Sequence, residues 1–249
     1  MKKVLNKSQI ERFSRQLILK NVGAKGQKKI LSSKILIVGV GGLGCPAAEN
    51  LVRAGVGTIG LIDNDIVNLS NIHRQSLFSS RDIKKLKVIV AAKKLKEINP
   101  LTRIKTYKSR LNKNNIKNII KKYEVIIDGS DNFKTKFLVN DYCMKLKKKL
   151  ITGAISKFDG HIFTFDFKDK KTASLKSFYQ ENEISDDVLN CEFEGVLCTT
   201  ASIVGSTQAN EALKMIMEIG QNLKNQILII DLLNLNFRKV KFKKQKLCL

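Results

Sequence analysis

The sequence predicts an α/β protein with a doubly wound, mostly parallel Rossmann-like sheet, helices on both faces and an antiparallel C-terminal extension. Two observations predict this fold. Short apolar runs alternate with segments of helical periodicity from residue 34 to residue 153, as in repeated strand–helix units. The first apolar run leads directly into the glycine-rich turn GVGGLG at 39–44, which is typical of the first strand–helix connection of such a sheet.

The alternating region begins after an amphipathic helix expected at 8–20, where Ser8 is the N-cap and Glu11 completes a capping box. The helix expected at 82–98 ends before Asn99-Pro100, because proline disfavours helix in the residue that precedes it. The expected strands are 34–38, 58–62, 103–107, 124–127 and 150–153, and the expected helices between them are 42–54, 82–98, 112–122 and 133–147.

The pattern changes in the C-terminal part of the chain. We expect a surface strand at 161–167, a helix at 201–219 and a closing strand pair at 226–230 and 236–242. The polar stretch 168–198 is too long for an ordinary connection and is a candidate functional loop. Without a repeat or a low-complexity linker, we expect one domain over 1–249, with a nucleotide-binding part at about 30–155 and a second part at about 156–249.

The composition is that of a globular protein with a net charge of +24. Lysine is spread along the whole chain without a basic tail, so we attribute the charge to compositional drift rather than to a nucleic-acid surface, although a nucleic-acid partner stays an alternative. The sequence has no apolar run of membrane-spanning length and no export signal. Five cysteines without a C-x-x-C pair complete the expectation of a cytoplasmic protein with reduced thiols.

The glycine turn predicts a nucleotide site. Gly39, Gly41 and Gly44 fit G-x-G-x-x-G, with Gly42 beside them, between a strand and a helix. The first glycine permits the tight turn, the second permits close approach of a phosphate, and the third lets the helix pack on the strand. The N–H groups of the helix N-terminus then face the anion.

The residues after the second strand distinguish ATP from NAD. Asp63 ends that strand and Asp65 follows, at the place where a carboxylate binds ribose hydroxyls in either case. A triphosphate needs cationic side chains in addition to the glycine turn, and these are available in Arg74 and Lys87. The polar side chains of Asn71 and Gln75 belong to the same candidate set.

A further carboxylate follows the fourth strand. Asp131 lies near the carboxyl end of that strand, where doubly wound sheets bind their ligands. A carboxylate beside phosphates is typical of a magnesium ligand, and Asn132 adds a hydrogen-bonding group. An alternative role for Asp131 is the N-cap of the following helix.

Several motifs, taken in order, resemble the MoeB/ThiF family, bacterial relatives of the ubiquitin-activating enzymes. They are RFSRQLIL at 12–19, GVGGLGCPAA at 39–48, AGVGTIGLIDNDIVNLSNIHRQ at 54–75, INP at 98–100, SDNF at 130–133, ITGA at 151–154 and GSTQANEALK at 205–214. The similarity extends from about residue 8 to residue 240, and is greatest to the molybdopterin-synthase adenylyltransferase branch.

The resemblance implies an ATP- and magnesium-dependent adenylyltransferase. Such enzymes transfer AMP to the C-terminal Gly-Gly carboxylate of a ubiquitin-like sulfur-carrier protein and release pyrophosphate, in molybdopterin or thiamine synthesis. By motif, Asp63 binds the ribose, Asn71, Arg74 and Lys87 bind the phosphates, and Asp131 binds magnesium. Arg15 resembles an arginine that reaches the ATP of a neighbouring subunit, which implies a homodimer.

The chain departs from the family pattern at the zinc ligands and in the SDNF segment. Many members bind a structural zinc ion through two C-x-x-C pairs, but Ser174 and Ser177 occupy the first pair and Cys248 alone remains near the second. Serine hydroxyls are poor zinc ligands, so we expect no zinc. Lys136 replaces the arginine of the SDNF-x-x-R pattern. Cys191 aligns with a cysteine that links covalently to the carrier in some relatives, and either a covalent role or none is compatible with adenylation.

Other functions stay open at this point. A related dehydratase that activates a tRNA base with ATP would share the nucleotide residues, and the positive charge would suit RNA. A non-catalytic carrier-binding subunit would agree with the lost zinc ligands. An NAD-dependent oxidoreductase is disfavoured by the set of Arg74, Lys87 and Asp131. The sequence does not identify the carrier.

Overall fold

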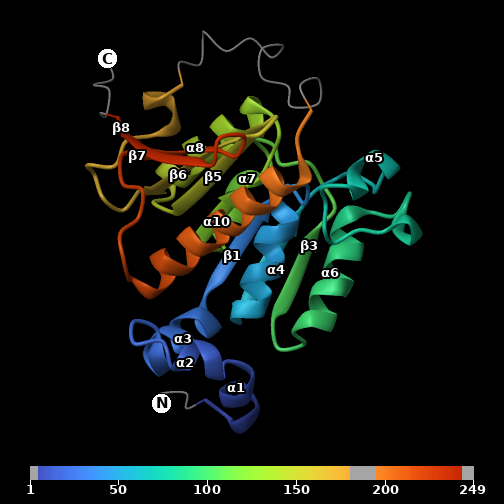
Figure 1. Ribbon diagram of the computed structural model, residues 1–249, viewed down its shortest axis with the longest axis vertical. Coiled ribbons are helices and arrows are strands. Elements are labelled where there is room, and N and C mark those ends of the chain that lie inside the picture. The colour runs from blue at the N-terminus through green and yellow to red at the C-terminus, as the bar shows by residue number, and fades with distance from the viewer. Residues whose placement is uncertain (1–4, 180–194, 243–249) are drawn as a thin grey trace.

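The computed structural model describes residues 5–179 and 195–242. Within these residues, eight strands form one sheet in the order β3-β2-β1-β4-β5-β6-β7-β8 (Figure 1). The first five strands are parallel, and β6 to β8 extend the sheet with antiparallel pairs, which confirms the expected fold class. The bounds are β1 Lys34–Val38, β2 Thr58–Ile62, β3 Arg103–Tyr107, β4 Val125–Asp128, β5 Lys149–Ser156, β6 Asp159–Asp166, β7 Gln226–Asp231 and β8 Asn236–Lys241.

Helices cover both faces of this sheet. One face packs against α4 (Gly44–Ala54), α6 (Lys87–Ile98) and α10 (Cys198–Met217), and the other against α7 (Ile116–Ile120) and α8 (Phe133–Lys145). Because β2 and β4 lie on opposite sides of β1, the chain changes winding direction there. The carboxyl ends of β1 and β4 therefore border the crevice at which doubly wound sheets bind ligands.

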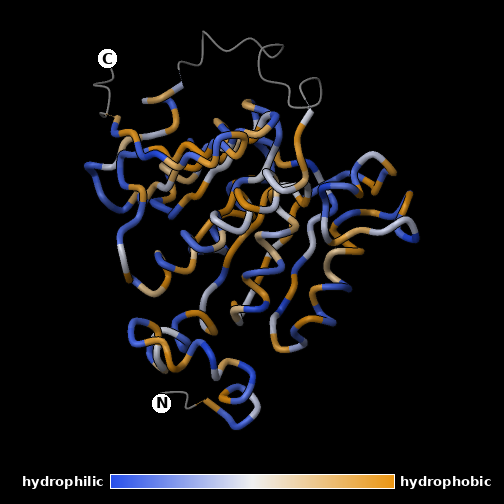
Figure 2. The backbone as a smooth tube through the Cα atoms, in the orientation of Figure 1, coloured by the Kyte–Doolittle hydropathy of each residue, from blue (hydrophilic) through white to orange (hydrophobic). Residues whose placement is uncertain are grey.

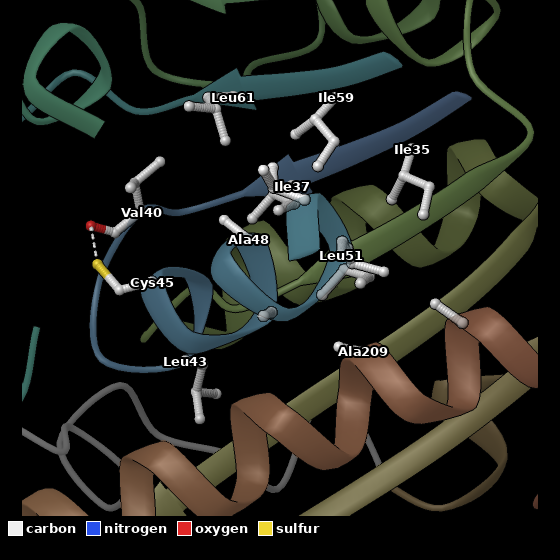
Figure 3. Packing of buried hydrophobic residues seen from close by; sticks show 14 of the residues in the cluster. Ile35, Ile37, Val40, Leu43, Cys45, Ala48, Leu51, Ile59, Leu61 and Ala209 are labelled. Atoms are coloured by element: carbon white, nitrogen blue, oxygen red, sulfur yellow. Dashed lines mark hydrogen bonds between the residues drawn. The ribbon is translucent and has the colours of Figure 1, made fainter. Parts of the chain in front are cut away.

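The core follows the alternation of side chains along the central strands. Ile35 and Ile37 of β1 pack with Ala48 and Leu51 of α4 (Figure 3), whereas Leu36 belongs to the cluster on the other face. Both faces of β1 are thus covered, which explains its unbroken apolar sequence. Figure 2 shows the same concentration of hydrophobic residues in the central strands.

The described cysteines are free thiols. Cys45 and Cys143 are buried, as expected of small core residues. Burial raises the pKa of the Cys45 thiol to about 12, so this group stays protonated in the core.

The N-terminal region differs from the expected single helix at 8–20. It contains α1 (Lys7–Arg12), α2 (Ser14–Leu17) and an unexpected third helix, α3 (Gly23–Ser32). The prediction of Ser8 as N-cap was wrong: the side chain of Asn6 accepts from the Gln9 amide at 2.9 Å, and Gln9 Oε1 accepts from the Asn6 amide at 3.1 Å.

The N-terminal helices lie at the amino ends of β1 and β2. Phe13 is buried beside Gly55, where an added Cβ would come within 2.4 Å of the ring. Gln27 donates to the carbonyl of Ala54 at 2.9 Å. This region therefore packs at the end of the sheet opposite to the carboxyl ends of the parallel strands.

Two further expectations are corrected. The expected helix 82–98 begins at Lys87, because Lys84 has a positive φ of 68° that interrupts a right-handed helix, and a 3₁₀ turn covers Ser80–Asp82. The strand expected on the surface at 161–167 is largely buried, since Ile162 packs under α10 while Phe163 and Phe165 pack on the other face. Among the described residues, no helix is long and apolar enough to span a membrane.

Candidate nucleotide-binding site

A cleft of about 730 Å³ opens at the carboxyl ends of β1, β2 and β4. Its walls come from the glycine turn after β1, the acidic segment after β2, the segment around Arg74, the start of α6 and the loop after β4. The predicted residues that line it are Gly39, Gly41, Gly42, Asp63, Asp65, Arg74, Gln75, Lys87, Asp131 and Asn132. The cleft thus brings together residues that are distant in sequence.

The glycine turn forms one wall of the cleft. Gly39 has a φ of 84°, and a Cβ there would lie 3.0 Å from the carbonyl oxygen of Gly129, so the loops after β1 and β4 touch. A Cβ at Gly44 would lie 2.0 Å from the carbonyl oxygen of Gly39. A Cβ at Gly41 would meet nothing closer than Gln75 Nε2 at 3.8 Å. Gly44 therefore serves packing, whereas Gly41 faces open space in the cleft.

Asp63 is fixed by the backbone around it. Its Oδ2 accepts from the Val40 amide at 2.7 Å, and its Oδ1 accepts from the Asp65 amide at 2.8 Å. Burial raises the pKa of Asp63 above its ordinary value, and the two amides and Lys87 partly oppose this effect. Each carboxylate oxygen keeps a lone pair with which it can accept a ribose hydroxyl.

Lys87 is the first residue of α6 and is buried except for 6% of its surface. Its Nζ lies 3.2 Å from Asp65 Oδ2, and its amide donates to the Asp65 carbonyl at 3.0 Å. A buried ammonium group needs such a partner. The ion pair with Asp65 therefore keeps the positive charge of Lys87 at the cleft wall and gives the buried ammonium group a partner.

The segment around α5 (Leu69–Ile72) supplies a second cation. Arg74 donates to the carbonyl of Ser70 at 2.9 Å, and its side-chain carbons lie near Gly42. Gln75 is 4% exposed, and its Oε1 has no hydrogen-bond partner within the described part of the chain. Asn71 does not line the cleft, because its side chain accepts from the Asn68 amide at 3.3 Å to cap α5.

The loop after β4 carries the predicted metal ligand. Asp131 is exposed and accepts from Asn132 Nδ2 at 3.1 Å. Asn132, rather than Asp131, is the N-cap of α8 and accepts from the Thr135 amide at 2.9 Å. The carboxylate of Asp131 therefore does not cap α8. No described group of three or more His, Cys, Asp or Glu side chains could hold a metal ion by itself.

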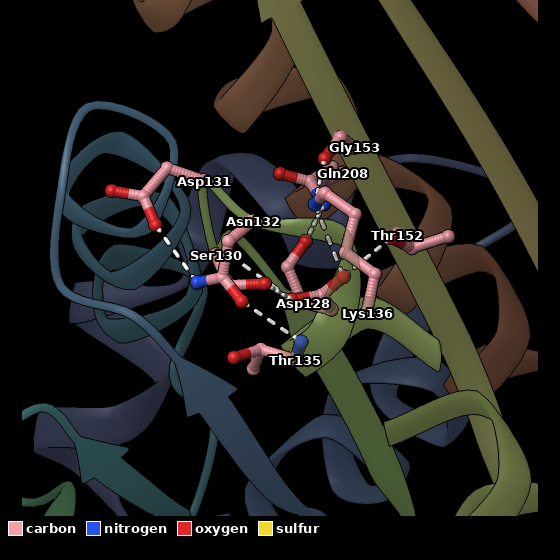
Figure 4. A network of polar contacts seen from close by, with 9 residues as sticks. All are labelled: Asp128, Ser130, Asp131, Asn132, Thr135, Lys136, Thr152, Gly153 and Gln208. Atoms are coloured by element: carbon pink, nitrogen blue, oxygen red, sulfur yellow. Dashed lines mark hydrogen bonds and ion pairs between the residues drawn. The ribbon is translucent and has the colours of Figure 1, made fainter. Parts of the chain in front are cut away.

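Asp128, the last residue of β4, was not among the predicted site residues. This fully buried carboxylate accepts from Ser130 Oγ and Thr152 Oγ1, both at 2.6 Å, and pairs with Lys136 Nζ at 3.2 Å (Figure 4). Lys136 also donates to the Gly153 carbonyl at 2.6 Å. An aspartate that closes an apolar strand was the available signal, because such a carboxylate needs buried partners.

Two predicted residues lie elsewhere. Arg15 is an exposed residue of α2, at the opposite end of the sheet, so it does not line the cleft of its own chain. Gly44 lies beneath the cleft wall and does not line it either. Cys191 lies outside the described residues, and its covalent role stays a prediction.

Ser174 and Ser177, which stand in place of the first C-x-x-C pair of the zinc site, form hydrogen bonds with the backbone. Ser174 and Ser177 cap a 3₁₀ turn reciprocally, and Ser177 Oγ accepts from the Ser174 amide at 3.3 Å. The Leu175 amide within this turn donates to Asn140 Oδ1 at 3.0 Å, which attaches the turn to α8. Hydroxyl groups held in this way do not fit a zinc site; that the protein binds no zinc stays a prediction.

The relatives of this chain are adenylyltransferases. It is 37% identical to a "Sulfur carrier protein adenylyltransferase" of Thermus thermophilus over 97% of this chain and 90% of the relative. It is 39% identical to "Adenylyltransferase and sulfurtransferase MOCS3" of Drosophila virilis, of which it spans 53%. It is 36% identical to a "Probable molybdopterin-synthase adenylyltransferase" of Gracilaria tenuistipitata, of which it spans 66%.

Solved structures share the fold. E. coli MccB matches 98% of this chain and 72% of its own, with a TM-score of 0.84 and 20% identity. The complex of MccB with ATP matches with a TM-score of 0.82 at 23% identity, over 95% of this chain and 73% of MccB. Residues 13–249 match the model of the ThiF family. The chain therefore belongs to the ThiF family.

Proposed function

We propose that this protein uses ATP to adenylate the C-terminal Gly-Gly carboxylate of a ubiquitin-like sulfur-carrier protein. One observation carries the proposal: a cleft at the switch point of the sheet has Arg74 and Lys87 on one side and Asp131 on another. The relative from Thermus thermophilus, which this chain matches over nearly its whole length, bears the name of that activity. Both the arrangement of charges and the relatives favour a nucleoside triphosphate over NAD.

The proposed reaction needs little help from acid–base groups. A peptide α-carboxylate has a pKa of about 3.5 and is ionised at neutral pH, so it attacks the α-phosphorus directly. A bond forms between the carboxylate oxygen and the α-phosphorus, the bond to the bridging oxygen breaks, and pyrophosphate leaves. The contribution of the protein is to align the two reactants and to stabilise the charge on the phosphates.

Each cleft residue has a place in this scheme. Asp63 accepts the ribose hydroxyls, and the N–H groups around Gly41 face phosphate oxygens. Arg74 and Lys87 neutralise the triphosphate, and Lys87 exchanges its contact with Asp65 for one with phosphate. Asp131 would hold a magnesium ion that enters with the nucleotide, and this ion would help to neutralise the phosphate charge, since magnesium sites commonly combine one or two carboxylates with substrate phosphates.

We further propose that the protein acts as a homodimer in the cytoplasm and folds as one domain. Arg15 lies at the end of the sheet opposite to the cleft of its own chain. Its predicted contact with ATP therefore requires the cleft of a second copy.

The decisive test is ATP–pyrophosphate exchange with candidate sulfur carriers added one at a time. We expect exchange with one carrier, and no exchange with the same carrier after its terminal Gly-Gly is removed. Carrier-dependent exchange would also assign the molybdopterin or the thiamine pathway. ATP binding without exchange for any carrier would contradict the proposal and favour the tRNA-modifying or non-catalytic alternative.

A further inference from the structure

A buried ion pair lies at the wall of the cleft beside the loop after β4, where Lys136 lines the cleft and Asp128 lies behind it. Asp128 is fully buried, and the side chain of Lys136 is 5% exposed. Lys136 Nζ lies 3.2 Å from Asp128 Oδ2 and donates to the Gly153 carbonyl at 2.6 Å (Figure 4). The pair therefore joins the end of β4, the first turns of α8 and the middle of β5.

The same carboxylate fixes the loop that carries Asp131. Asp128 Oδ1 accepts from both the amide and the hydroxyl of Ser130, at 3.0 and 2.6 Å. The backbone carbonyl of Asp128 accepts from Gln208 Nε2 of α10 at 2.8 Å. Asp128 is thus bonded to three neighbouring elements, through Lys136 of α8, Thr152 of β5 and Gln208 of α10. Asp131 is left exposed on the side of the cleft.

The charge of Asp128 is unfavourable for an anionic ligand unless it is compensated. Its neighbours Gly129 and Ser130 line the cleft, so a phosphate would approach a carboxylate buried just behind them. Buried charges interact strongly because the interior screens them poorly. Within the described residues, Lys136 is the cation that forms an ion pair with Asp128.

We propose that Lys136 is a positioning residue for nucleotide binding, which neutralises Asp128 behind the triphosphate site and keeps the loop that carries Asp131 in place. The inference rests on the proposed function in one respect, that the ligand is a triphosphate. A lysine suffices for this role, because the two acceptors, Asp128 Oδ2 and the Gly153 carbonyl, belong to different strands and need no planar bidentate donor.

Binding of ATP and of adenosine to the same variants tests the inference. Lys136→Met removes the charge and keeps the length of the side chain, and Lys136→Arg keeps the charge. The double variant Asp128→Asn/Lys136→Met removes both charges, and the hydroxyl groups of Ser130 and Thr152 can still bond to the amide. Lys145→Met, an exposed lysine on the same helix, is the matched control.

The expected pattern separates charge from folding. Lys136→Met raises the dissociation constant for ATP about tenfold or more, and changes that for adenosine less than about twofold. The double variant restores most of the ATP affinity, and Lys136→Arg and Lys145→Met keep it. An equal loss of ATP and adenosine binding in Lys136→Met, or no recovery in the double variant, would overturn the inference.

The outcome also separates this inference from the proposed function. If the wild-type protein binds ATP and Lys136→Met binds it equally well, the inference alone fails. If the wild-type protein binds no ATP, the proposed function fails as well. A variant with normal thermal unfolding and normal adenosine binding, but weak ATP binding, supports both.

Discussion

The carboxylate of Asp63 accepts a hydrogen bond from the backbone amide of Val40 at 2.7 Å, and so connects the end of β2 to the glycine turn after β1. Its other oxygen accepts from the Asp65 amide at 2.8 Å. Asp63 therefore shapes the cleft before any nucleotide binds. The residue predicted to bind ribose is also a structural part of the site.

The double role predicts the effect of Asp63→Asn. The amide of asparagine has one acceptor oxygen, so its NH₂ group must face one of the two backbone N–H groups. We expect a loss of about 1–3 kcal/mol in the free energy of unfolding, together with weaker ATP binding. Urea unfolding and calorimetry measure the two effects. Glu97→Gln on the exposed face of α6 is the control, and unchanged stability in Asp63→Asn would contradict the structural role.

The glycine turn provides a matched pair of variants. In Gly44→Ala, the new Cβ would lie 2.0 Å from the Gly39 carbonyl oxygen, so the helix and the turn must separate. In Gly41→Ala, it would point into open space within the cleft. We expect Gly44→Ala to destabilise the fold, and Gly41→Ala to keep the unfolding temperature and to weaken ATP binding about tenfold or more.

The reverse result would show that these two glycines have been assigned the wrong roles. Equal loss of stability in both variants would mean that neither position is reserved for a ligand. Adenosine binding to Gly41→Ala adds a second readout, because a methyl group beside the phosphates should affect ATP more than adenosine.

The sequence predicted the repeating part of the fold better than its ends. The residues of β1, β2 and β3 agree with the expected strands. The first two are apolar runs next to a glycine, and β3 begins three residues after Pro100, which ends the preceding helix. The helix α3 was missed because Gly23 and Gly26 weaken its helical pattern, although Gly26 lets α3 approach Met217 of α10. Such tertiary contacts are not visible in a local pattern.

Site residues were predictable from the sequence where they follow directly after a strand. Gly39 and Gly41 follow directly after β1 and Asp63 follows directly after β2, whereas Lys87 lies on α6 and was predicted only together with Arg74. The Asp128–Lys136 pair spans eight positions along the chain and also uses Thr152, 24 residues away, so its meaning depends on the fold. Asn71 was placed with the phosphates, but its side chain caps α5 instead of lining the cleft.

Asp131→Ala tests the proposed magnesium site. Within the described part of the chain, the Asp131 carboxylate accepts a hydrogen bond from Asn132 Nδ2 at 3.1 Å and is exposed, so its removal should change the unfolding temperature little. We expect the rate of carrier-dependent exchange to fall about a hundredfold or more, because a metal–phosphate contact is lost. Full activity in this variant would contradict the magnesium role of Asp131.

We expect the stability of the fold to depend on pH through Asp82, which lies five residues before Lys87. The hydrogen bond from Lys94, at 2.8 Å, lowers the pKa of Asp82 well below its ordinary value, and Ser79 assists. This carboxylate therefore stabilises the fold fully above about pH 4, and the contribution is lost as the pH falls through the lowered pKa.

The comparison of wild type with Asp82→Asn measures that contribution. We expect the unfolding temperature of the variant to be lower by about 2–4 °C at neutral pH. The difference should shrink as the solution is acidified below about pH 4. A difference that is independent of pH would assign the effect to packing rather than to the charge of Asp82.

The predicted sharing of active sites can be tested with two inactive variants. Arg15 lies on α2 at one end of the sheet, and Arg74 lines the cleft at the other end. If Arg15 acts in the cleft of a second subunit, Arg15→Ala and Arg74→Ala should each be inactive alone. In a mixed dimer, one of the two clefts regains both arginines, because the Arg15→Ala subunit supplies Arg74 and its partner supplies Arg15.

We expect mixing and re-equilibration of the two variants to restore about a quarter of wild-type exchange activity, since half of the dimers are mixed and each has one intact cleft. Mixing either variant with itself is the control. A normal rate in Arg15→Ala would remove Arg15 from the reaction, and two inactive variants that do not rescue each other would place both arginines in the same subunit's site.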